Sequence, residues 1–138
     1  MNIDLRTGGP HSPEKTAEVA DLVAEGIRYL NHATLGGAGG LEQPADIDRL
    51  ISALATMASR LPQLFRQAEV NLDRIAEAPG VYDDRGHDAA QTVGSVSMGL
   101  RSASASADML LESLHIAHQA SAHLGCRDDG TEGSSGNG

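Results

Sequence analysis

Apolar residues recur along this chain at steps of three and four, the spacing of one face of an α-helix. The first such stretch opens at Ser12-Pro13 and ends at the glycine run 36–40. A second runs from about Pro44 to Ala78, and a third runs from about residue 88 to residue 124. No alternating strand pattern and no internal repeat is found, so the sequence predicts an all-α fold.

The second and third stretches each have an uninterrupted heptad-like seam, which is typical of helices packed at a shallow angle. The seam of the second comprises Ile47, Ile51, Leu54, Ala58, Leu61, Phe65, Ala68, Leu72 and Ile75. That of the third comprises Val93, Val96, Leu100, Ala103, Ala107, Leu110, Leu114, Ala117, Ser121 and Leu124. The connection over residues 79–87 is short, which predicts two antiparallel neighbours of nearly equal length. Pro62 is expected to kink the second helix without breaking it, because the seam keeps its phase.

Side-chain size selects one register for this hairpin. If residues whose numbers total 168 face each other, Phe65 meets Ala103 and Ala58 meets Leu110. Large side chains then oppose small ones in nearly every layer, as dense packing requires. A slip of one heptad would leave voids in some layers and clashes in others.

A second apolar stripe on the middle helix, formed by Leu50, Met57 and Leu64, calls for a cover. The first helix is long enough to reach only the Leu64 region, at about 1.5 Å per residue. The expected architecture is therefore an antiparallel three-helix bundle over residues 13–125 with a long protruding hairpin. Residues 1–12 and 126–138 are predicted to be disordered tails, because they are polar and rich in glycine.

Composition narrows the function classes. The 138 residues include 19 acidic and 10 basic ones, for a formal charge of −9, which disfavours binding to nucleic acid or to a membrane surface. The N-terminus lacks the apolar segment of a secretory signal, and no run of 18 apolar residues occurs. The single cysteine, Cys126, excludes a disulfide framework and suits a reducing compartment, so a cytoplasmic location is expected.

Candidate catalytic and metal-binding motifs are weak. Glu112 and His115 have the Glu-x-x-His spacing of di-iron bundles, but the motif occurs once and lies off the seam. His115, His118 and His123 are spread around the helix, which favours a solvated surface over a metal site. The turn 83–88 carries three carboxylates without the spacing of a calcium loop, so we expect a solvated turn in which Asp88 caps the third helix. We predict no cofactor, no metal and no enzymatic activity.

The uncovered end of the hairpin is the candidate interaction surface. Residues 92–99 combine two Gly, two Ser and three β-branched residues, and such a segment is a poor helix by itself. The candidate contact residues there are Val81, Tyr82, Gly94, Met98 and Gly99. Two hairpins laid together would form a four-helix bundle, so we expect a protein partner, most simply a second copy in a homodimer.

Leu30-Asn31-His32-Ala33-Thr34, Gln43-Pro44-Ala45-Asp46 and Arg60-Leu61-Pro62-Gln63-Leu64 resemble stretches in small uncharacterised helical proteins of actinobacteria, some of plasmid or integrated-element origin. That resemblance implies no catalytic residues. The architecture is also similar to the paired helices exported by type VII secretion systems, although the Trp-x-Gly turn and the export signal are absent. The sequence therefore favours a non-enzymatic helical interaction module. The alternatives are a type VII-like exported partner and a carboxylate–histidine metal bundle.

Overall fold

A computed structural model describes residues 3–127, and within that range it contains three α-helices and no strand. They are α1 (Pro13–Ala33), α2 (Pro44–Ala76) and α3 (Ala89–Ser121). The chain forms two compact units, one ending at Glu42 and the other beginning at Gln43. The all-α class is confirmed, whereas packing of the first helix on Leu50, Met57 and Leu64 stays a prediction.

Helix α1 begins and ends at the residues that the sequence marks. The Ser12 hydroxyl accepts a hydrogen bond from the Lys15 amide at 3.1 Å, and Pro13 occupies the first turn. The helix ends at Ala33, after which the Thr34 amide donates to the Leu30 carbonyl at 2.9 Å. In the following loop the backbone of Gly40 lies so close to the Ala33 carbonyl that a Cβ atom would collide with it. Position 40 therefore has room only for a glycine.

The predicted tails are only partly described. Residues 3–12 take an irregular conformation, with Asp4 paired to Arg6 at 2.8 Å. Cys126 is exposed, and residues 128–138 lie outside the described part of the chain. The disorder expected for both segments stays a prediction.

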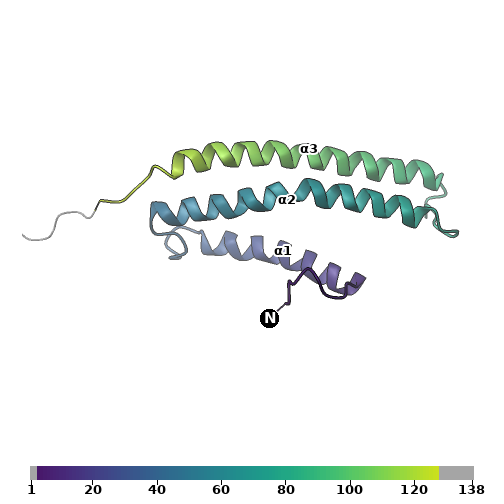
Figure 1. Ribbon diagram of the computed structural model, residues 1–138, viewed down its shortest axis with the longest axis horizontal. Coiled ribbons are helices and arrows are strands. Elements are labelled where there is room, and N and C mark those ends of the chain that lie inside the picture. Colours follow the sequence, from purple (N-terminus) through teal and green to yellow (C-terminus); the bar gives the residue numbers. More distant parts are fainter. Residues whose placement is uncertain (1–2, 128–138) are drawn as a thin grey trace, which may run out of the picture. The chain divides into compact units, whose positions relative to one another are not determined.

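Helices α2 and α3 form an antiparallel hairpin and lie side by side along their lengths (Figure 1). Each has 33 residues, so the expected equal lengths are confirmed. Helix α2 continues through Pro62 without a break. Asp88 caps α3 as predicted, with its carboxylate accepting from the Ala90 amide at 3.1 Å. Helix α3 ends at Ser121, three residues before the predicted end.

Polar contacts between the two helices identify their register. Arg101 Nε donates to Glu69 Oε1 at 2.8 Å. At the open end of the hairpin, opposite the loop that joins α2 to α3, Asp48 Oδ1 lies 2.6 Å from Ser121 Oγ and 2.9 Å from His118 Nδ1. In each pair the two residue numbers add up to within two of 168, the total that the predicted register requires. A slip of one heptad would change this total by seven. The predicted register is confirmed at the level of the heptad.

The predicted seams are wrong in one respect, because the inner face of each helix is rotated toward the next residue along the chain. Ala68 and Ile75 are exposed, while Glu69 and Ala76 are partly buried. On α3 the corresponding exposed seam positions are Val96 and Leu110, and the partly buried positions that follow them are Ser97 and Leu111. Small and polar residues at the centre of the contact let the helices approach closely, and the larger apolar residues lie at its edges.

The layer between α2 and α3 is built from small side chains. The buried residues among those described are Ala55, Ala58, Ala107 and Ser121, and no large side chain is completely buried. Because alanine contributes little apolar area, the hairpin gains less from burial than a core of leucine or phenylalanine would provide. Much of its apolar surface is therefore still available for contact with other molecules.

Candidate functional site

All five candidate contact residues are exposed in the structure. Val81 and Tyr82 lie in the loop at the tip of the hairpin, and Tyr82 is 80% exposed. Gly94 and Met98 share one face of α3, whereas Gly99 lies about 100° around the helix from Met98. The structure thus separates the candidates into a tip and a helix face.

The two glycines of α3 have no role in packing within the chain. A Cβ atom added to Gly94 or Gly99 would meet nothing within 4 Å. Glycine inside a helix costs up to about 1 kcal/mol relative to alanine. This cost is not offset by a close contact inside the hairpin, as would be the case at a tight helix crossing.

The apolar face of α3 extends well beyond the predicted residues. Met98, Met109 and Ile116 are 72%, 69% and 65% exposed, and Ala105 lies between them. At 100° per residue these four side chains fall within about 40° of one another, on the side of α3 opposite α2. We call this set the outer stripe. The outer stripe is hard to find in the sequence because small and polar residues separate its members, although the period of its large residues signals it.

Asp83 organises the turn between α2 and α3. Its side chain is 2% exposed, and it accepts hydrogen bonds from the Arg85 backbone amide, the Arg85 guanidinium and the Thr92 hydroxyl. The Arg85 side chain, then Thr92 and the Arg85 amide, hold the pKa of Asp83 well below its ordinary value. His87 Nδ1 lies 3.9 Å away. The turn is therefore ordered around the buried Asp83 carboxylate, whereas residues 84–88 are exposed, in agreement with the predicted solvated turn.

The lowered pKa of Asp83 makes the turn sensitive to acid. The stabilisation that the Asp83 carboxylate gives the turn is present above the ordinary carboxyl pKa of 3.8 and is lost progressively as the pH falls below that value. Asp83→Asn is therefore expected to lower the melting temperature by several degrees at pH 7, and this difference should shrink progressively below about pH 4. Melting followed by circular dichroism between pH 2.5 and 7 measures it. Asp84→Asn removes the same charge from the exposed neighbour and should have little effect, so equal losses in both variants would contradict the role of Asp83.

At the open end of the hairpin, Asp48, His118 and Ser121 form a polar cluster between α2 and α3. Ser121 Oγ donates to Asp48 Oδ1 and also lies 3.2 Å from the His118 carbonyl. His118 Nδ1 is buried and lies within ion-pair distance of Asp48, without hydrogen-bond alignment. The His118 side chain is 39% exposed, as expected for a solvated surface, but its Nδ1 atom lies toward Asp48 and is buried.

The cluster lacks the geometry of a nucleophilic triad. In such a triad the imidazole lies between the serine and the carboxylate, so that it can take the serine proton. Here Ser121 donates directly to Asp48, and the hydroxyl is engaged with the acid. This arrangement fixes the two helices to each other and does not activate Ser121.

Glu112 and His115 are exposed on α3. Over residues 3–127, no group of three or more His, Cys, Asp or Glu side chains gathers in a way that could hold a metal ion. Within the same range, no helix is both long and apolar enough to cross a lipid bilayer.

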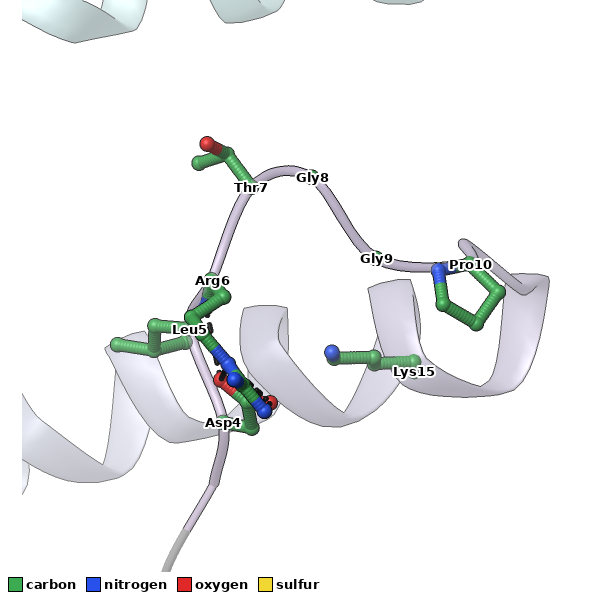
Figure 2. A pocket seen from close by; sticks show the side chains of 8 residues that line it. All are labelled: Asp4, Leu5, Arg6, Thr7, Gly8, Gly9, Pro10 and Lys15. Carbon is green, nitrogen blue, oxygen red and sulfur yellow. Dashed lines mark hydrogen bonds and ion pairs between the residues drawn. The ribbon is translucent and has the colours of Figure 1, made fainter.

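A concave surface forms where the N-terminal segment passes the first turns of α1 (Figure 2). It is lined by Asp4, Leu5, Arg6, Thr7, Gly8, Gly9, Pro10 and Lys15. The Arg6 guanidinium, the strongest anion-binding group here, is already paired with Asp4, and Thr7 points away from that pair. Arg6, and more weakly Lys15, lower the pKa of Asp4. The charges of this concavity therefore largely satisfy one another.

No protein-family model matches the chain, and neither a curated protein nor a solved structure is significantly similar to it.

Proposed function

We propose that this protein is a non-enzymatic helical module that acts in the cytoplasm by binding another protein through the α2–α3 hairpin. The observation that carries the proposal is the exposure of large apolar side chains at the hairpin tip and on α3, with Tyr82 and Met98 among the most exposed. Exposed apolar groups that lie close together mark interaction sites more often than scattered ones do. The formal charge of −9 makes phosphate backbones and anionic lipids poor partners.

The distribution of burial gives further support. The buried positions of the hairpin are alanine and serine, and its large apolar residues are at most partly buried. Association would remove them from water, a gain of about 25 cal/mol for each Å² of apolar surface buried. Gly94 and Gly99 leave open space beside α3, where another helix could approach closely.

The test is cross-linking in the cells that naturally make the protein. A benzophenone-bearing residue at position 105, on the outer stripe of α3, should yield one predominant protein adduct, and the same group at Gln63, exposed on α2, should not. Met98→Glu should reduce the adduct at least tenfold, whereas Val70→Glu adds the same charge at an exposed position on α2 and should leave it unchanged. Absence of any adduct, or equal loss with Met98→Glu and Val70→Glu, would overturn the proposal.

A further inference from the structure

The outer stripe of α3 has a spacing that reads the same in both directions. Met98, Ala105, Met109 and Ile116 are separated by seven, four and seven residues. When one α3 is reversed against another, Met98 therefore meets Ile116, and Ala105 meets Met109. Gly94 and Ala120 extend the same pattern outward, since their midpoint is also position 107.

A self-matching stripe is what a two-fold dimer requires. In such an interface the same patch is used on both copies, so that if residue i contacts residue j, then j also contacts i. Two antiparallel helices related by a two-fold axis at the level of Ala107 meet this condition. Because Ala107 itself lies on the opposite, α2-facing side, the hairpin packing is not disturbed.

The charges beside the stripe fit the same arrangement. Arg101 and Glu112 lie on the same flank of the outer stripe, about 60° and 40° from Met98. In an antiparallel pair the same flanks of the two helices adjoin, and the Arg101 of one copy lies at the level of Glu112 of the other. Two Arg101–Glu112 ion pairs, related by the two-fold axis, would thus form between the copies. Arg101 is 73% exposed while bound to Glu69, so its guanidinium remains accessible to a second carboxylate.

The opposite flank favours close approach. Ser102, Ser106 and Ser113 lie there, and their small side chains let a second helix come near. Serine hydroxyls can also bond within their own helix, as Ser95 does to the Gln91 carbonyl on the same face at 3.2 Å. A helix with these side chains exposes no unpaired charge to its partner on this flank.

We propose that the protein pairs with a second copy of itself through the outer stripe, with the two α3 helices antiparallel about a two-fold axis at position 107. This inference rests on the proposed function and specifies its partner and geometry. The interface runs from position 98 to position 116, roughly 27 Å of helix at 1.5 Å per residue. An interface of this length is small, so the dimer dissociates on dilution.

Sedimentation of the full chain over a range of concentrations tests the pairing. The wild type should show a reversible monomer–dimer equilibrium between about 1 and 500 µM, as expected for a small interface. Met109→Glu should weaken association at least tenfold, because it places two like charges near the dyad in a desolvated contact. Val70→Glu should leave the dissociation constant unchanged, since Val70 is exposed on α2, away from the stripe.

Disulfide trapping tests the orientation. In a Cys126→Ser background, Ala105→Cys and Met109→Cys chains are prepared separately and mixed under mild oxidation. The antiparallel arrangement predicts a mixed disulfide between the two variants in several-fold excess over either homodimer. A parallel pair would give mainly homodimeric disulfides, because each position would then face itself.

The outcomes separate the inference from the proposed function. A wild type that stays monomeric throughout, an unchanged equilibrium in Met109→Glu, or an excess of homodimeric disulfides overturns the antiparallel dimer. If the adduct at position 105 persists in any of these cases and contains another protein, the interaction module stands with a different partner. If that adduct is also missing, both are overturned.

Discussion

Replacing Ala58 with Leu is expected to destabilise the hairpin by about 3 kcal/mol, at the upper end of the range for overpacked cores. Ala58 has no exposed surface and lies in the contact between α2 and α3. A larger side chain there cannot turn outward, so the two helices must separate and the neighbouring layers lose contact. Urea denaturation followed by circular dichroism measures the change.

Ala53→Leu is the matched control, because Ala53 is exposed on the same helix. It should change the free energy of unfolding by less than about 0.5 kcal/mol, as is usual for surface positions. If Ala58→Leu is tolerated as well as Ala53→Leu, α2 and α3 are not packed through this alanine layer in solution.

The second large effect concerns Phe65, the only aromatic residue of the seam. Phe65→Ala is expected to cost about 2 to 3 kcal/mol, slightly less than for a completely buried phenylalanine, because this side chain is only partly buried. Ala103→Leu should overpack the same layer and cost about 1 to 2 kcal/mol. Since residues whose numbers total 168 face each other, the new Leu should fill the space left by Phe65 in the double variant.

A double-mutant cycle measures this compensation. The double variant should lose at least 1 kcal/mol less than the two single losses together, because the substitutions share one layer. Phe65→Ala combined with Ala120→Leu serves as the control, since Ala120 is exposed on the other side of α3. Strict additivity in both combinations would show that Phe65 and Ala103 do not meet.

The helices could be predicted because their ends have local signals. Ser12 with Pro13, Pro44, and Asp88 each mark a first turn, and the structure begins its three helices at these places. The register could also be predicted, because size complementarity is a property of the side chains alone. Both results depend on residues that are either adjacent in sequence or repeated at a regular interval.

The rotation of the inner faces could not be predicted in the same way. Counting apolar positions gives Ile75 and Leu110 the same weight as alanine, although they occupy far more space. A contact centred on small residues brings the backbones closer, and its centre therefore shifts toward Ala55, Ser97 and Glu69. The pairing of Glu69 with Arg101 also depends on this rotation.

The polar groups were the hardest to place from sequence. Asp48 and Ser121 are 73 residues apart, and nothing in the spacing of either suggests a shared hydrogen bond. Asp83 looks like any acidic turn residue until the chain reverses and brings Thr92 to it. Of the candidate contact surface, the exposure of Tyr82 and Met98 followed from the pattern, but the full length of the outer stripe did not.

The alanine layer between α2 and α3 also determines how the hairpin responds to temperature. Exposure of apolar surface is the main source of the heat-capacity increase on unfolding, typically about 12–15 cal/mol/K per residue. A hairpin without a completely buried large side chain exposes less new apolar surface when it unfolds. Its heat-capacity increase on unfolding therefore falls below this range. Its free energy of unfolding therefore varies little with temperature, and cooling unfolds few of the molecules. Pairing of two copies would add the missing apolar burial, which makes the midpoint of thermal unfolding rise with protein concentration.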